Sequence, residues 1–176
     1  MARNVEIKAR VENIGSVLAR AAELADEGPV EIVQDDTFFA CNNGRLKLRA
    51  FPSGEGELIF YRRTDQKGPK ESYYVLYPTT SPDALRETLS MAYGRTGRVR
   101  KHRTLFMSGR TRIHLDCVEG LGNFLELEVV LAEGESAEEG ETVARSLMQK
   151  LGIHEDQLVE GAYVDLLASP NLLSRT

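Results

Sequence analysis

The sequence lacks most of the segments that would assign it to a specialised class of protein. It has only two cysteines, Cys41 and Cys117, with no Cys-x-x-Cys motif and no histidine at ligand spacing. This argues against a disulfide framework and against a zinc site. No apolar run approaches the roughly 18 residues of a membrane span. The charged N-terminus also has no signal-peptide core, so we expect a cytoplasmic protein with no membrane partner.

The charge of the chain argues against one further class of partner. The net charge is −5, which disfavours nonspecific binding to nucleic acid. The hydrophobic fraction of 41% and the charged fraction of 28% are those of an ordinary soluble globular protein. One domain over residues 1–176 is the default expectation for this length, and it leaves room for a sizeable core.

The clearest pattern in the chain lies between residues 112 and 131. Two predicted strands there have one apolar face and one face that carries Arg112, His114, Asp116, Glu126 and Glu128. Two carboxylates two residues apart on a strand repel each other unless a cation lies between them. Oxygen ligands favour Mg²⁺ or Mn²⁺. The alternative, which stays open, is a strand face whose charges are solvated.

The same alternation of polar and apolar residues recurs along the chain. We expect further strands over residues 3–11, 30–40, 45–51, 57–63, 71–78 and 97–107, and a flexible basic loop over 65–70. Helical periodicity predicts helices over residues 13–26, over 81–93, between Ser136 and Gly152, and over 154–168. The tally is eight strands, most of them in antiparallel hairpins.

The charged residues gather on one face of these strands. The polar faces carry Glu6, Lys8, Arg45, Lys47, Arg49, Arg63, Lys101, Arg103 and the five residues of the 112–131 segment. The predicted helices need apolar surface to pack on, and the apolar strand faces supply it, so the charged faces should turn inward. We therefore predict an α+β fold, an eight-stranded antiparallel β-barrel with helices outside. A polyanion that carries its own Mg²⁺ would satisfy both the cations and the carboxylates of such a lumen.

Several segments, taken in chain order, resemble one protein family. They are Asn4-Val5-Glu6-Ile7-Lys8, QDDTFF, GRLKLR, LIFYRR, Lys70-Glu71-Ser72, VRKHRTLF and IHLDCVEGLGNFLELE. In this order they resemble the CYTH family, the triphosphate tunnel metalloenzymes, which include class IV adenylate cyclases and thiamine triphosphatases. The resemblance covers nearly the whole chain, as a single CYTH-like domain. One departure is Asn4, where the family's Glu-x-Glu-x-Lys strand has its first glutamate.

The resemblance implies a tunnel that binds a triphosphate together with Mg²⁺ or Mn²⁺. The implied triphosphate-binding residues are Lys8, Arg45, Lys47, Arg49, Arg63, Lys70, Lys101 and Arg103. The implied metal ligands are Glu6, Glu126 and Glu128. Asp116 is a further candidate ligand, which could instead pair with Arg112 or Lys101. For His114 a structural role is expected more than a catalytic one, and for Tyr163 packing.

Three functions remain open from the sequence. The resemblance favours a class IV adenylate cyclase-like enzyme, which converts ATP to cyclic AMP and pyrophosphate. The first alternative is a triphosphatase that hydrolyses thiamine triphosphate, inorganic triphosphate or a nucleotide. The second is a noncatalytic binder of triphosphate or polyphosphate, which Asn4 favours. The sequence identifies no general base, and a homodimer is a further alternative for its assembly.

Overall fold

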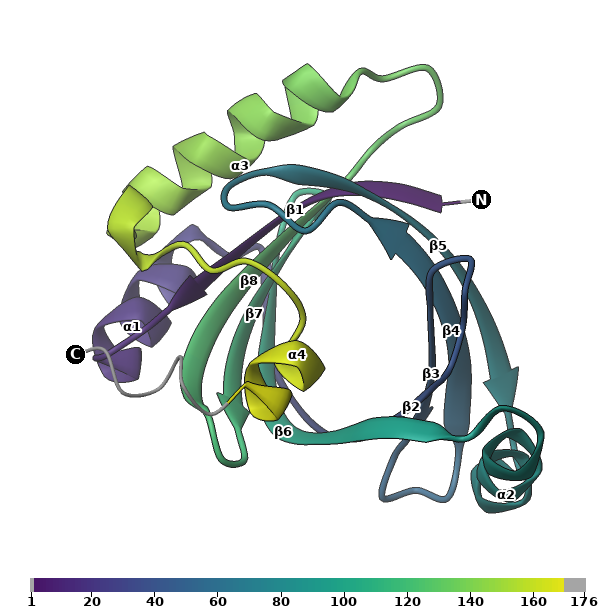
Figure 1. Ribbon diagram of the computed structural model, residues 1–176. Coiled ribbons are helices and arrows are strands. Elements are labelled where there is room, and N and C mark those ends of the chain that lie inside the picture. The colour runs from purple at the N-terminus through teal and green to yellow at the C-terminus, as the bar shows by residue number, and fades with distance from the viewer. Residues whose placement is uncertain (1, 170–176) are drawn as a thin grey trace.

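Eight antiparallel strands close into a ring in the computed structural model, which describes residues 2–169 (Figure 1). The strands are β1 (Ala2–Arg10), β2 (Glu27–Phe39), β3 (Arg45–Ala50), β4 (Gly56–Arg63), β5 (Lys70–Thr79), β6 (Arg95–Ser108), β7 (Thr111–Val118) and β8 (Gly122–Val130). Around the ring their order is β1-β5-β4-β3-β2-β6-β7-β8. The predicted α+β architecture, a closed antiparallel sheet with helices outside, is confirmed.

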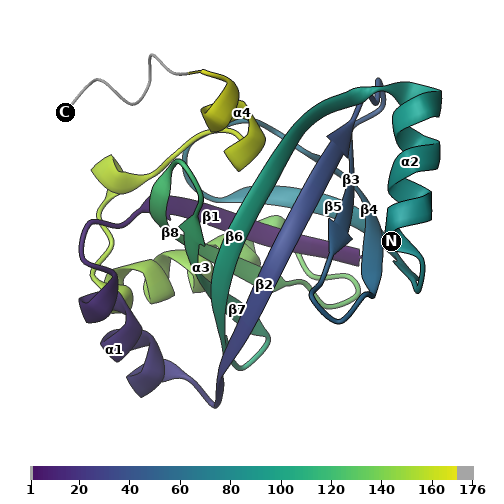
Figure 2. The same ribbon diagram turned by 90° about the horizontal axis from the view of Figure 1, so that it is seen from below.

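The helices lie around the outside of the ring and at one of its ends. They are α1 (Ile14–Leu24), α2 (Pro82–Tyr93), α3 (Ala137–Leu151), the 3₁₀ turn η1 (Glu155–Gln157) and α4 (Tyr163–Ala168). Figures 1 and 2 show α1 and α3 on the side of β1, β7 and β8, α2 beside β2 and β3, and α4 at one end of the ring. No helix within residues 2–169 is long and apolar enough to cross a membrane.

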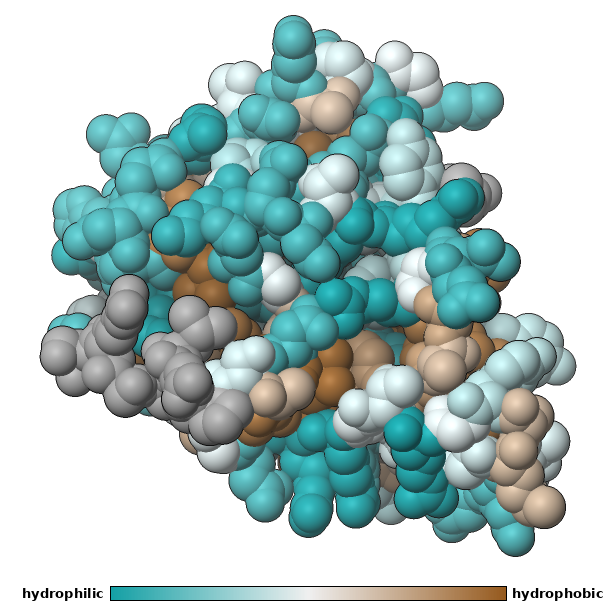
Figure 3. Space-filling view, viewed as in Figure 1, coloured by the Kyte–Doolittle hydropathy of each residue, from teal (hydrophilic) through white to brown (hydrophobic). Residues whose placement is uncertain are grey.

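Burial of the apolar strand faces under α1 and α3 decides which way the polar faces point. The main core cluster contains Val5 and Ile7 of β1 and Leu125 and Leu127 of β8, all fully buried against the two helices. Because side chains alternate across a strand, their neighbours in sequence must face the inside of the ring. The outer surface is mostly hydrophilic, as Figure 3 shows for one side of the molecule.

The ends of α3 follow its sequence signals. Ser136 accepts a hydrogen bond from the Glu139 backbone N–H, and the Glu139 side chain accepts one from the Ser136 backbone, which forms a capping box. Gly152 ends the helix in the left-handed conformation, with φ of 74°. These local signals fix the length of the helix that covers β1 and β8.

Most element boundaries differ from the sequence prediction by one or two residues, and three differences have a clear structural reason. β2 begins at Glu27 instead of residue 30, because it continues to pair with β6 as far as Met107. The predicted loop over 65–70 ends earlier, since Lys70 starts β5 opposite Glu6. The helix predicted over 154–168 is divided into η1 and α4, because Gly161 adopts a positive φ of 78° that a helix does not contain.

Candidate functional site

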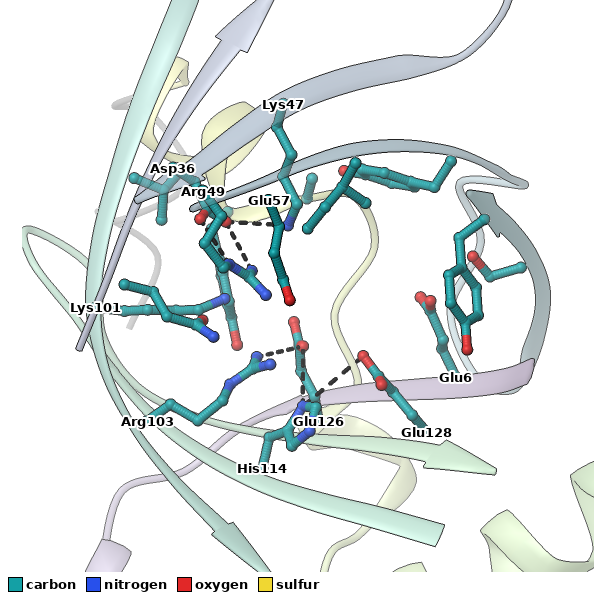
Figure 4. Close-up of a pocket in the computed structure, with 18 of the residues that line it drawn as sticks. Glu6, Asp36, Lys47, Arg49, Glu57, Lys101, Arg103, His114, Glu126 and Glu128 are labelled. Atoms are coloured by element: carbon teal, nitrogen blue, oxygen red, sulfur yellow. Dashed lines mark hydrogen bonds and ion pairs between the residues drawn. The ribbon is translucent and has the colours of Figure 1, made fainter. Parts of the chain in front are cut away.

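The ring encloses a cavity of about 330 Å³ that is lined by the inward faces of the strands (Figure 4). Six of the predicted triphosphate-binding residues line it, namely Lys8, Lys47, Arg49, Arg63, Lys101 and Arg103. They come from β1, β3, β4 and β6, so the ring brings together cations that are far apart in the sequence. Arg112 of β7, which was not among the predicted ligands, lines the same cavity.

The other two predicted triphosphate-binding residues do not line this cavity. Arg45 donates two hydrogen bonds to Asp165 of α4, at 2.9 and 2.6 Å, and pairs with Asp65 at 3.3 Å. Lys70 is buried, and its Nζ donates to the carbonyl oxygen of Gln66 at 3.0 Å. Both side chains are engaged by the protein itself, and their assignment as phosphate ligands stays a prediction.

A cluster of His114, Glu126 and Glu128 lies on the wall of the cavity that β7 and β8 form (Figure 4). Each offers a ligand atom within 4.8 Å of the others. The cluster follows from strand register, because His114 pairs with Glu126 between β7 and β8. His114 Nδ1 is buried without a hydrogen-bond partner in the described chain, 4.0 Å from Glu126 and 3.8 Å from Glu128. Burial lowers the pKa of His114, which favours the neutral imidazole that metals bind.

The remaining predicted metal ligands are held by arginines. Glu6 lies opposite Glu128 in the β1–β8 pair, but Arg63 Nη1 donates to it at 2.7 Å. Both oxygens of Asp116 accept hydrogen bonds from Arg103, at 2.6 Å each, and the Tyr163 hydroxyl donates to Oδ2 at 2.9 Å. Burial opposes ionisation of Asp116, yet the charges of Arg103 and Lys101 lower its pKa to about 2. The ligand roles of Glu6 and Asp116 stay predictions.

Asp36 of β2 holds the cations of β3, on the wall across the cavity from the His114 cluster (Figure 4). Sequence analysis missed this role. Its Oδ1 accepts from Arg49 Nε at 2.8 Å, and its Oδ2 accepts from Arg49 Nη2 at 2.8 Å and from Lys47 Nζ at 3.0 Å. Although burial opposes ionisation, these two cations lower the pKa of Asp36. The QDDTFF segment contained the residue, but two adjacent aspartates gave no sign of which one faces inward.

The segment before α4 contributes to the cavity from outside the sheet. The Gly161 carbonyl oxygen accepts hydrogen bonds from Lys8 Nζ at 3.1 Å and from Arg63 Nη2 at 3.0 Å. Tyr163 lines the cavity, and the ammonium groups of Lys8 and Lys101 lie 4.0 and 5.0 Å from its ring centroid. Packing is therefore only part of the role of Tyr163, which also bonds to Asp116.

Lys47 supplies a prediction about pH. Burial lowers the pKa of its ammonium group to about 7, against the opposing effect of Asp36. A bound anion restores the charged form, so binding above pH 7 takes up a proton. We expect the affinity for inorganic triphosphate to fall by up to about tenfold per pH unit above pH 7. The free protein should instead gain stability over this interval, because the unfolded chain holds the proton that the folded chain has lost.

Calorimetry in two buffers of different ionisation enthalpy measures this proton uptake at pH 8. Lys47→Met should show less uptake than the parent protein. Equal uptake by the two proteins would assign the proton to another group.

Solved structures with the same architecture come from several organisms. A protein from Pyrococcus horikoshii OT3 has a TM-score of 0.83 and 22% identity, over 93% of this chain and 99% of that one. An adenylate cyclase candidate from Vibrio parahaemolyticus has a TM-score of 0.79 and 22% identity, over 94% and 98%. A Hippeastrum protein, described as an adenylyl cyclase candidate with a dominant triphosphatase activity, has a TM-score of 0.66 and 14% identity, over 94% and 95%. At these identities the likeness shows the fold alone.

The family assignment rests on the sequence itself. No curated protein matches the chain. The sequence model of the CYTH domain matches residues 2–163, which contain all eight strands and the charged residues of the tunnel. The chain therefore belongs to the CYTH domain family.

Proposed function

We propose that the protein is a divalent-metal-dependent enzyme that acts on a triphosphate inside the tunnel. The reaction we propose is the conversion of ATP to cyclic AMP and pyrophosphate. One observation carries the metal-dependent action on a triphosphate, and the resemblance of the sequence to class IV adenylate cyclases supports the choice of reaction. The cluster of His114, Glu126 and Glu128 shares one cavity with the six predicted cations and Arg112. Cations alone would hold any polyanion, whereas cations that share a cavity with a carboxylate–imidazole cluster suit a polyphosphate bound with its metal.

The donor set fits Mg²⁺ or Mn²⁺. Two carboxylates and a neutral imidazole nitrogen without a partner offer the oxygen and nitrogen ligands that Mn²⁺ accepts, and the carboxylates suit Mg²⁺. When bound, the ion would neutralise charge on the phosphate oxygens. His114, Glu126 and Glu128 would hold it, and Glu6 lies on the neighbouring strand.

Several ion pairs of the tunnel are arranged for an exchange of partners. Glu126 lies 3.3 Å from Lys8 and 2.9 Å from Arg103, and Glu6 lies 2.7 Å from Arg63. On substrate binding each cation would turn to a phosphate oxygen and leave its carboxylate to the metal. Because the cations already lie in the cavity, this exchange needs only side-chain rotation, after which they stabilise charge that develops on the phosphates.

Hydrolysis of the terminal phosphate is the second candidate, and the position of α4 at one end of the cavity favours it. Ala162 and Tyr163 line the cavity next to α4, which lies at one end of the ring. A triphosphate that enters from the other end would place its terminal phosphate deepest, near Lys8 and Arg63. The Hippeastrum protein of the same fold is described as having a dominant triphosphatase activity.

A panel of substrates tests the proposal. ATP, thiamine triphosphate and inorganic triphosphate are each incubated with Mg²⁺ and with Mn²⁺, and the products are separated as cyclic AMP, pyrophosphate or phosphate. We expect cyclic AMP and pyrophosphate from ATP, whereas release of phosphate from any of the three would identify the hydrolase. Tight binding without any product would instead identify a noncatalytic triphosphate-binding protein.

Asn4 supplies a further prediction. Its side chain lines the cavity, is 3% exposed, and its Oδ1 has no hydrogen-bond partner within residues 2–169. Asn4→Glu would place a second carboxylate on the inner face of β1, two residues from Glu6. We expect a lower melting temperature without metal, because like charges then share a site. With excess Mn²⁺ we expect a larger rise in melting temperature and faster turnover, since a charged ligand holds a hard cation better.

Thermal melts with and without Mn²⁺ measure the stability effect, and initial rates measure turnover. Asn4→Gln is the matched control, because it lengthens the side chain without adding charge. If Asn4→Glu binds Mn²⁺ no better than this control, the side chain lies outside the metal site.

A further inference from the structure

Glu57 is a carboxylate of the tunnel that the proposed function leaves unused. It lies on the inner face of β4, paired with Arg49 of β3, and Figure 4 shows its side chain pointing into the cavity. Arg49 directs Nε and Nη2 to Asp36, and Lys47 also binds Asp36. Between residues 2 and 169 no ion pair or hydrogen bond engages the Glu57 carboxylate. Lys47 and Arg49 thus give their hydrogen bonds to Asp36, although the Glu57 charge also helps to raise the pKa of Arg49.

Gln34 is a second acceptor without a partner in the same part of the tunnel. It lies on β2, two residues before Asp36 on the same inner face, and lines the cavity. Its side chain is only 4% exposed, yet its Oε1 has no partner in the part of the chain that the structure describes. A buried acceptor of this kind costs stability unless a ligand supplies a donor. Gln34 and Glu57 therefore flank the Asp36–Arg49 pair as two free acceptors.

Both acceptors lie away from the end that α4 occupies. Arg45, at the start of β3, binds Asp165 of α4, so the start of the antiparallel strand β4, with Glu57, lies at the other end of the ring. Glu57 is half-buried and Leu76 is 45% exposed, whereas Gln34, deeper in the tunnel, and Lys8 at the α4 end are each 4% exposed. This outer part of the tunnel is where the organic group of a triphosphate would lie.

Apolar side chains also line the cavity near the two acceptors. Ile59 of β4 pairs with Leu76 of β5, next to Glu57, and Ile32 lies two residues before Gln34 on β2. All three side chains line the cavity. Apolar side chains together with a few fixed polar groups are usual in a binding site for a flat ring.

We propose that Glu57 and Gln34 form a subsite for an amino-substituted heteroaromatic ring, a group that adenine and the aminopyrimidine of thiamine share. The inference rests on the proposed function and names the substrate class of the same tunnel. The amine donates to the two acceptors while the ring packs against Ile32, Ile59 and Leu76. A carboxylate near a polyanion otherwise opposes binding, so Glu57 also selects against inorganic triphosphate.

Binding measurements on the whole protein test this subsite. ATP, inosine triphosphate, thiamine triphosphate and inorganic triphosphate are titrated by calorimetry in Ca²⁺, with the cell contents checked for products. Inosine triphosphate carries a ring carbonyl where adenine carries its amine. We expect Glu57→Leu to weaken the binding of an amine-bearing triphosphate at least about tenfold, the loss of a hydrogen bond to a charged group. Inosine triphosphate and inorganic triphosphate, which lack this amine, should bind equally well or more tightly.

The two amine-bearing ligands distinguish the source of the ring, since the one whose binding depends on Glu57 is the one that the subsite accepts. Gln34→Met, of nearly the same size, should weaken that ligand by a smaller factor. Glu55→Gln, an exposed carboxylate in the β3–β4 turn, is the control and should change nothing.

Three results would overturn the subsite while leaving the proposed function intact. One is equal binding of ATP, thiamine triphosphate and inorganic triphosphate to the parent protein. Another is parallel weakening of all ligands by Glu57→Leu. The third is weaker binding of Mn²⁺ alone in that variant, which would make Glu57 a metal ligand. Failure of every triphosphate to bind would instead reject the proposed function itself.

Discussion

Glu128→Gln is expected to weaken Mn²⁺ binding at least about tenfold and to lower turnover by about 10²-fold or more, because a metal ion contributes several kcal/mol of charge stabilisation. Glu128 is one of the three residues whose ligand atoms lie within 4.8 Å of one another. It is a cleaner target than Glu126, which also pairs with Lys8 and Arg103. The partner of Glu128 is Arg112 at 3.2 Å, and this arginine is 38% exposed. Arg112 can therefore turn to water, and the fold should change little in stability.

Calorimetry with Mn²⁺ and initial rates measure the two effects of Glu128→Gln. Glu31→Gln is the control, because it makes the same chemical change on an exposed side chain of β2, outside the tunnel. Unchanged Mn²⁺ affinity in Glu128→Gln would remove this residue from the metal site. A loss of turnover with full affinity would assign it to substrate positioning instead.

Asp116→Asn is expected to destabilise the protein by about 3–5 kcal/mol, the cost of removing one partner from a buried ion pair. Asp116 is fully buried, and both of its oxygens accept hydrogen bonds from Arg103. Lys101 lies 3.7 Å away and is buried as well. The substitution would remove this carboxylate from two buried cations, of which Arg103 would keep only Glu126 as a partner among the described residues. Urea denaturation measures the free energy of unfolding.

The outer face of the ring offers a matched control for Asp116→Asn. Asp35 accepts two hydrogen bonds from Arg98, at 2.8 and 2.5 Å, in the same paired geometry, but Arg98 is 54% exposed. Asp35→Asn should cost no more than about 1 kcal/mol. Mn²⁺ affinity separates the two roles that the sequence left open for Asp116. A variant that keeps its stability and loses Mn²⁺ binding would make Asp116 a ligand after all.

The sequence by itself determined the direction in which the charges face. Period-two alternation places Glu126 and Glu128 on one face of β8 and Lys101 and Arg103 on one face of β6. The apolar faces had to pack under α1 and α3, since no other surface was available to those helices. Inward charges and a closed ring follow from these two facts, which is why the fold class and six of the lumen cations could be predicted from the residues.

Only the tertiary structure decided which charges meet. Alternation assigns a side chain to a face, but not to one of the partners that a closed ring brings within reach. Asp116 could pair with several cations, and strand register places Arg103 opposite it. His114 joins the carboxylate cluster for the same reason, because β8 places Glu126 opposite it.

Contacts between distant segments escaped the sequence for a related reason. Asp165 of α4 holds Arg45 away from the cavity, and the Gly161 carbonyl oxygen binds Lys8 and Arg63. More than 90 residues separate the partners in each of these contacts. The sequence of a six-residue helix does not predict such contacts. They form only after the ring has closed and the segment with α4 lies at one end of the ring.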